Sequence, residues 1–342
     1  MQKPTRQAFT LVELLISTVL LVTLLLILVS MINQTSGVWR FTTNKVEQFS
    51  RAQNAFDAIT RRLSQATLNT YWDYDSPNAP TKYIRQSDLR FISGSAQALT
   101  GGTASSPNTP TTRPGHGIFF QAPLGYSDAA DFRGLENLLN SWGYYIDFSS
   151  DSQTRPAFLD SLNPKLPLRY RYRLMELMQP SNKLAIYSAP TSNGWTGTGW
   201  FTGALSATPS QVHVLAENVV ALVLLPKLSP KEDSTGTALA PEYSYDSTVT
   251  NGNAALNPFN QLPPLVQVTL VALDDLSAGR VANGEQAPDL GISGLFDPNS
   301  PNSASNYQAD LAKLQGTLAA KKLNYRIFST QVVLRAAKWS RN

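Results

Sequence analysis

Cysteine is absent from the 342 residues, and histidine is almost absent, with only His116 and His213. Without cysteine the chain can form no disulfide framework, no thiolate nucleophile and no cysteine-ligated zinc site. Two histidines far apart in the sequence leave little for a histidine-based triad or a metal centre. We expect His116, which lies between Gly115 and Gly117, to begin a strand or a turn, and His213 to lie on a strand face.

Charged residues are also few, at 15% of the chain, and they do not cluster. Lysine and arginine total 28 against 24 acidic residues, and the net charge of +4 is spread without basic blocks, so a nucleic-acid partner is not indicated. The chain contains no GxSxG elbow, no Walker loop and no GxGxxG after a predicted strand. We therefore expect no enzyme activity, no catalytic residue, no metal and no cofactor.

One long apolar segment stands near the N-terminus. From Leu14 to Ile32 the sequence has no charge, proline or glycine, which matches the roughly 20 residues that a helix needs to cross a bilayer. Lys3 and Arg6 precede it, so we expect the N-terminus in the cytoplasm and the polar remainder outside. A plain signal anchor would leave Glu13 unexplained, because an acidic side chain costs about 2.5–3.5 kcal/mol at the bilayer centre.

The stretch AFTLVELL, which begins at Ala8, resembles the class III signal of type IV pilins and type II secretion pseudopilins. The resemblance implies that a prepilin peptidase cuts between Ala8 and Phe9 and methylates the new terminus at Phe9. The usual glycine before the cut is here Ala8. Glu13 is then fifth in the mature chain, and the resemblance implies that it pairs with the terminal ammonium of an adjacent subunit during assembly.

Apolar residues continue at helical spacing beyond the span, at Val46, Phe49, Phe56, Ile59 and Leu63, with the polar Gln53 on the same stripe. We expect an α+β, pilin-like fold in which one long helix is half in lipid and half packed on an antiparallel sheet with long loop insertions. The expected segments are the leader 1–8, the transmembrane half 9–36, the amphipathic half 37–70 and an extracytoplasmic domain 71–342. The alternative is a separate juxtamembrane helix after a break near Gly37.

Period-two alternation or short β-branched and aromatic runs predict nine strands, and one late helix is expected over 307–323. In the predicted strand 168–177, Arg169, Arg171 and Arg173 alternate with Tyr170, Tyr172 and Leu174, which favours a solvated basic face. The last strands resemble those of minor pilins and of the J-type minor pseudopilin, and the chain also resembles the verrucomicrobial pilin-like cassette protein C family. The strands are expected at 82–92, 116–122, 142–148, 168–177, 184–188, 212–215, 219–225, 265–273 and 325–335.

Three short segments are candidate binding elements. The glycine-rich stretch 194–203 carries Trp195, Trp200 and Phe201, which we interpret as an exposed aromatic loop that could serve as a contact surface. The oxygen-rich segments 73–78 and 297–303 break the EF-hand pattern and are expected to be turns and not calcium sites.

The sequence thus predicts a minor pseudopilin or pilin-like structural subunit of a type II secretion or type IV pilus-like system. Its expected location is the bacterial inner membrane, in a single pass with the C-terminal domain in the periplasm, and then a filament or the cell surface. The partners implied are prepilin peptidase/methyltransferase, other pilin-like subunits and inner-membrane lipid. The alternative is a membrane-anchored extracytoplasmic binding protein or adhesin that uses a pilin-like anchor.

Overall fold

The computed structural model describes residues 11–100, 113–132, 134–152, 154–187, 197–207 and 210–340, without the side chains of 37, 38 and 40–48. The chain divides into two compact units, 1–48 and 49–342, which are considered separately. The helices are α1 (Leu11–Leu63), α2 (Ala96–Thr100), α3 (Gly199–Leu205), α4 (Asp275–Arg280) and α5 (Tyr307–Ala320), with short 3₁₀ turns at Ala130–Phe132, Ala157–Ser161, Ser181–Lys183, Ala254–Leu256 and Ser303–Asn306.

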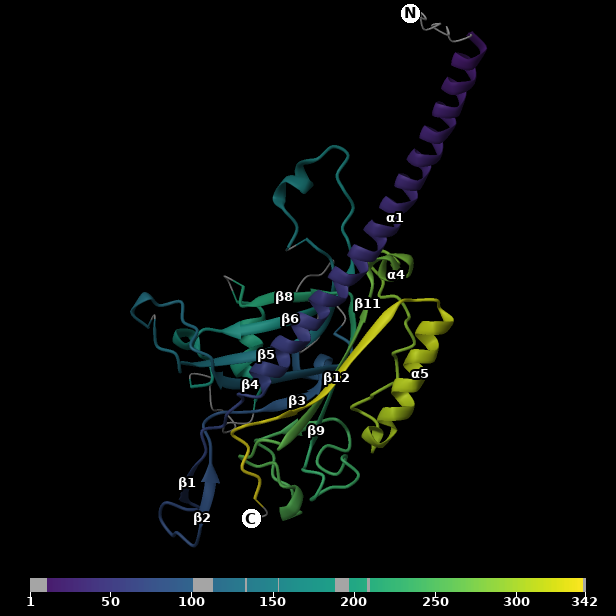
Figure 1. Cartoon of the computed structure of the whole chain (residues 1–342). Coiled ribbons are helices and arrows are strands. Elements are labelled where there is room, and N and C mark those ends of the chain that lie inside the picture. The colour runs from purple at the N-terminus through teal and green to yellow at the C-terminus, as the bar shows by residue number, and fades with distance from the viewer. Residues whose placement is uncertain are drawn as a thin grey trace, which may run out of the picture. The chain divides into compact units, whose positions relative to one another are not determined.

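The strands of the described chain form two antiparallel sheets and one hairpin (Figure 1). The six-stranded sheet has the order β10-β3-β4-β5-β6-β8, the three-stranded sheet has the order β12-β11-β9, and β1 pairs with β2. Their bounds are β1 (Tyr71–Tyr74), β2 (Tyr83–Gln86), β3 (Ile92–Ser95), β4 (His116–Pro123), β5 (Leu139–Ser149), β6 (Arg171–Gln179), β8 (Val212–Glu217), β9 (Val219–Lys227), β10 (Tyr245–Asp246), β11 (Leu265–Leu273) and β12 (Tyr325–Val333).

A single residue, Asn218, carries the chain from β8 of one sheet into β9 of the other. Its φ of 60° lies in the left-handed region, which asparagine tolerates better than most residues. Its N–H donates to the carbonyl of Tyr172 at 2.7 Å, and its own carbonyl accepts from the N–H of Leu273 at 2.9 Å. The sharp corner between the sheets is therefore bonded to both of them.

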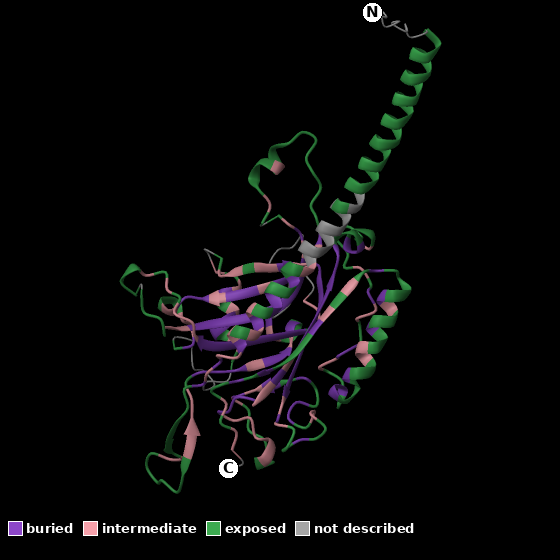
Figure 2. Cartoon of the chain, in the orientation of Figure 1, coloured by how far each residue is buried: buried purple, intermediate pink, exposed green. Residues whose placement is uncertain are grey.

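Strand β9 is buried on both faces, which explains its nearly unbroken apolar sequence. On one side Leu222 and Leu224 join a core that also contains the end of α1 and the six-stranded sheet. On the other side Val223 and Leu225 join a second core, covered by α5 through Leu314, Leu318 and Tyr307. Figure 2 shows this burial along the central strands.

The predicted α+β class is confirmed, and so are most of the strands and the late helix, which is α5. The segment 184–187 was expected in a strand but forms a turn after a 3₁₀ helix. Helix α1 is continuous from Leu11 to Leu63, so the alternative with a break near Gly37 is wrong. The helix ends at Leu63 and not at residue 70. Beyond it, Thr67 donates its N–H to the carbonyl of Gln121 on β4.

Candidate functional site

The N-terminal part of α1 is an apolar helix long enough to span a membrane. The span covers Leu11–Ser36, 26 residues, and its most apolar window of 18 residues has a mean hydropathy of 2.9 and no buried residue. Exposed apolar surfaces of this size are typical of helices that contact a membrane or another protein. The chain thus carries a single membrane anchor or a signal sequence among its described residues.

Three hydroxyl side chains inside the span are satisfied by the helix itself. Ser17 donates to the carbonyl of Leu14 and Thr18 to that of Leu15, both at 2.9 Å, and Thr23 donates to the carbonyl of Val19 at 2.7 Å. Such back-bonding removes the cost of placing an unpaired hydroxyl in hydrocarbon. Glu13 is the one charged side chain of Leu11–Ser36.

Glu13 lies in the first turn of α1 and is exposed. A carboxylate near the amino end of a helix is favoured by the helix dipole, by roughly 0.3–1 kcal/mol at an exposed site. That gain does not offset the cost of burial in hydrocarbon. The predicted cleavage site at Ala8 and Phe9 lies outside the described residues.

The C-terminal part of α1 packs on the sheets through small and aromatic residues. Ala52, Ala55, Phe56, Ile59 and Leu63 are buried, and the Phe56 ring lies 5.8 Å from that of Phe328 on β12. Gln53, which the sequence placed on this stripe, is exposed. The two alanines occupy the buried positions instead, because a small side chain lets the helix approach the sheet closely.

A polar cluster fixes the last turn of this helix. Arg62 donates from Nη1 to the hydroxyl of Tyr144 at 3.1 Å and to the carboxylate of Glu176, and its guanidinium lies 4.2 Å from the ring centroid of Trp142. Glu176 and Tyr144 are buried, on β6 and β5. This cluster was not predicted from the sequence. Glu176 within the apolar end of the predicted strand 168–177 could have indicated a buried carboxylate that needs a cation.

His116 begins β4, as expected, but is completely buried and joins three separate segments. Its Nδ1 accepts from the backbone N–H of Leu224 on β9 at 3.0 Å, so Nε2 carries the proton and donates to the carbonyl of Phe296 at 2.8 Å. Burial lowers the pKa of His116 to about 4, which keeps the ring neutral. This histidine is structural. His213 lies exposed on β8.

The expected exposed aromatic loop is wrong for its two described aromatic residues. Trp200 and Phe201 lie in α3 and are 2% and 0% exposed. Phe201 stacks on Phe119 of β4 at 3.8 Å, and the absence of a side chain at Gly143 leaves room for the Phe119 ring. The glycines of the segment suggested a loop, but the aromatic pair is core. Trp195 lies outside the described residues.

The expected solvated arginine face is also wrong in part. Arg173 is 1% exposed and donates to the carbonyls of Ser150 at 3.0 Å and Arg169 at 3.2 Å. Arg169 and Arg173 both contact the carboxylate of Glu217, at 2.6 and 3.3 Å. Arg169 and Arg173 are therefore already paired, whereas Arg171, at the start of β6, is half-buried and donates to the carbonyl of Tyr170 at 3.0 Å.

The oxygen-rich segment 297–303 forms turns, as expected, whereas the segment 73–78 begins with Asp73 and Tyr74 in β1 and bends only after them. Asp75 accepts from the backbone N–H groups of Ser76 and Thr81 at 3.0 and 2.8 Å, and these bonds, with the Thr81 hydroxyl first among the causes, lower the pKa of Asp75 to about 2. Asp297 accepts twice from Asn299. Within the described ranges no group of three or more acidic or histidine side chains could hold a metal ion.

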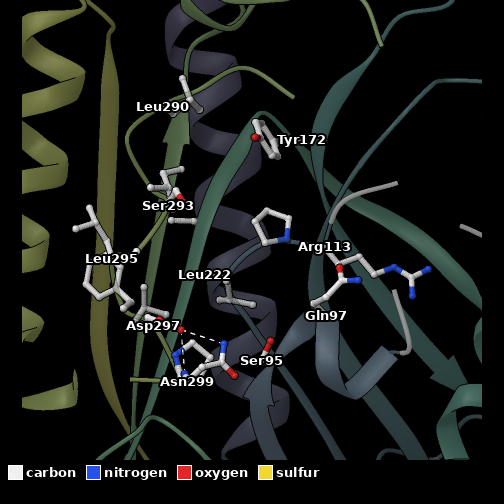
Figure 3. A pocket seen from close by; sticks show the side chains of 18 of the residues that line it. Ser95, Gln97, Arg113, Tyr172, Leu222, Leu290, Ser293, Leu295, Asp297 and Asn299 are labelled. Carbon is white, nitrogen blue, oxygen red and sulfur yellow. Dashed lines mark hydrogen bonds between the residues drawn. The ribbon is translucent and has the colours of Figure 1, made fainter. Parts of the chain in front are cut away.

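A cavity of about 550 Å³ lies between β9, the tip of β3 and the loop 288–299 (Figure 3). Its wall is mostly apolar, with Leu222 and Leu295 among the lining residues. The side chain of Arg113, at the rim, is directed away from the middle of the cavity (Figure 3). It donates instead to the carbonyl of Thr100 at 3.1 Å. Asp297 is used by its own turn, so the cavity presents little convergent chemistry.

No family model, no curated protein and no solved structure matches the chain.

Proposed function

We propose that this protein is a minor pseudopilin or pilin-like structural subunit that leaves the membrane for a filament after processing at Phe9. The observation that carries the proposal is Glu13, the one charged side chain of the span Leu11–Ser36, in the first turn of its helix. A buried carboxylate is tolerated when it is paired, and a freshly cut amino terminus of a neighbouring subunit is a suitable cation. The C-terminal part of α1, which is buried in the sheet core, supports the same proposal, because a pilin-like subunit is expected to pack this half of its helix on strands.

In this mechanism the chain performs no chemistry of its own. A prepilin peptidase removes residues 1–8 at the inner membrane, the span packs against the spans of other subunits, and the sheet domain remains on the periplasmic side. The pair between Glu13 and the neighbouring terminus would set the axial register, since each subunit supplies one carboxylate and one ammonium.

Processing and assembly can be tested separately in the native host. Mass spectrometry of the mature protein is expected to show methylated Phe9 at the N-terminus. Glu13→Val is expected to insert in the membrane normally but to enter filaments at least about tenfold less, because losing one partner of a buried pair exceeds the roughly 1.4 kcal/mol that a factor of ten requires. Ser17→Ala, which removes a self-satisfied hydroxyl one turn further along, is the matched control and is expected to assemble normally.

Two results would contradict the proposal. Recovery of the protein with residues 1–8 intact means that the N-terminus is a plain anchor. Normal filament incorporation of Glu13→Val means that the carboxylate has no pairing role.

A further inference from the structure

The hairpin β1–β2 presents an aromatic surface. In its register Trp72 is opposite Arg85 and Tyr74 is opposite Tyr83. Residues directly opposite each other in an antiparallel pair, and residues two apart on one strand, share a face. These four side chains therefore lie on one side of the hairpin, which we call the aromatic face.

The aromatic face is open to solvent. Trp72 is 56% exposed, Tyr74 47% and Tyr83 63%. The rings of Tyr74 and Tyr83 stack with centroids 4.9 Å apart, and the Arg85 guanidinium lies 5.4 Å from the Trp72 ring centroid. The hairpin extends away from both sheets (Figure 1), so the fold itself does not cover these rings. Three adjacent exposed aromatic rings mark an interaction site.

A polar cavity of about 360 Å³ adjoins this face, because Arg85 belongs to both. Its lining contains two cations, Arg85 and Lys338, and no carboxylate. Throughout the described part of the chain, no acidic side chain lies within ion-pair distance of either cation. The other polar side chains of the lining are those of Thr67, Asn69, Thr70, Asn260 and Gln261.

The cavity is held in shape by bonds that cross the sequence. Arg85 donates to Oε1 of Gln261 at 2.6 Å and to the hydroxyl of Ser340 at 2.9 Å, and Asn260 donates to the carbonyl of Arg85 at 2.8 Å. Asn260 and Gln261 are 7% and 4% exposed. Hydrogen bonds thus hold the base of the hairpin to the loop at 260 and to the segment that follows β12. A ligand would therefore meet a preorganised site.

We propose that the aromatic face and the adjoining cavity form a binding site for an acidic polysaccharide. The apolar C–H face of a pyranose ring stacks on an aromatic ring, as other flat apolar groups do. The exposed side chains of Asn69 and Thr70 and the Arg85 guanidinium match sugar hydroxyls, and the charges of Arg85 and Lys338 match carboxylate substituents. The lack of any carboxylate in the lining favours an acidic ligand over a neutral one. This site goes beyond the proposed assembly function and does not depend on it.

Binding of the full-length protein in detergent micelles to four acidic polysaccharides, polygalacturonate, alginate, hyaluronan and chondroitin sulfate, tests the proposal at 0.15 M salt. At least one of them is expected to bind, and Trp72→Ala, Tyr83→Ala and Lys338→Glu are each expected to weaken its binding by about threefold to tenfold, the range that a stacked ring or a partly exposed charge supplies. Tyr71→Ala removes an exposed ring from the opposite face of the same strand and is expected to leave the affinity unchanged.

Three outcomes would overturn the proposal. One is that none of the four polymers binds. Another is that polyglutamate, which is acidic but has no sugar rings, binds equally well and is insensitive to Trp72→Ala, because the interaction would then be general electrostatics. The third is that the aromatic-face variants alter only self-association of the protein, which would make the surface a contact between subunits. Unchanged thermal unfolding of each variant shows that a loss of binding is not a loss of fold.

Discussion

Lowering the pH is expected to destabilise the sheet domain through one residue, His116. The neutral ring accepts from Leu224 and donates to Phe296, so it links β4, β9 and the loop at 296. Protonation of Nδ1 would remove the acceptor and place its N–H against the N–H of Leu224, in a site from which solvent is excluded.

The size of the effect follows from linkage. The pKa of histidine is about 6.5 in an unfolded chain, and burial lowers the pKa of His116 to about 4 in the folded protein. Between these values the unfolded state binds the proton and the folded state does not, so the stability is fully present above about 6.5 and is lost as the pH falls towards 4. At 1.36 kcal/mol for each factor of ten, the loss is about 2 kcal/mol at pH 5 and about 3 kcal/mol at pH 4.

The measurement is urea unfolding of the full-length protein in micelles, followed by tryptophan fluorescence between pH 7 and pH 5. His116→Asn keeps an acceptor for the Leu224 N–H but does not titrate. It is expected to be less stable at pH 7 by about 1–3 kcal/mol and to lose about 2 kcal/mol less than the wild type on acidification. His213→Asn removes the exposed histidine and is expected to keep the wild-type slope. Equal acid sensitivity of the wild type and His116→Asn would refute the reasoning.

Two further substitutions test how the core is built. Gly143→Ala would place a Cβ 2.2 Å from Cδ1 of Phe119, so calorimetry is expected to show a loss of about 1–3 kcal/mol in the free energy of unfolding. The control Gly203→Ala, in α3 with nothing within 4 Å of the new Cβ, is expected to be neutral or slightly stabilising. A neutral Gly143→Ala would contradict the close packing of Phe119 on this glycine. Arg62→Ala is expected to lower the free energy of unfolding in urea by about 2–4 kcal/mol, because it leaves the Glu176 carboxylate buried without its cation. Combining Arg62→Met with Glu176→Leu is expected to recover most of that loss. Additive losses in the double variant would show that the two residues are not coupled.

The sequence was sufficient for the features that depend on local pattern. The unbroken apolar run of β9, the alternation in β11 and the spacing of Leu314 and Leu318 in α5 each identify their element, because burial repeats with the period of the backbone. The apolar helix that is long enough to span a membrane follows from length and composition in the same way.

The errors arose where a distant partner decides the outcome. Gln53 has helical spacing but is exposed, since the sheets accept Ala52 and Ala55 closely and leave no room to bury an amide. Arg173 alternates with apolar residues yet is buried, because carbonyls at the end of β5 bind its guanidinium. Trp200 and Phe201 follow glycines and suggested a loop, but Phe119, which lies far earlier in the chain on β4, provides the surface that buries them.

The contact between Phe56 and Phe328 has a consequence for biosynthesis. Helix α1 leaves the ribosome long before β12, the strand that covers its C-terminal part, and Arg335 donates its N–H to the carbonyl of Ser64 at the same junction. These contacts cannot form until β12 has been synthesised. The apolar stripe of the nascent helix therefore stays open while the intervening sheets are made, and a chain truncated before residue 325 would leave this stripe without its partner strand and present it to chaperones and proteases.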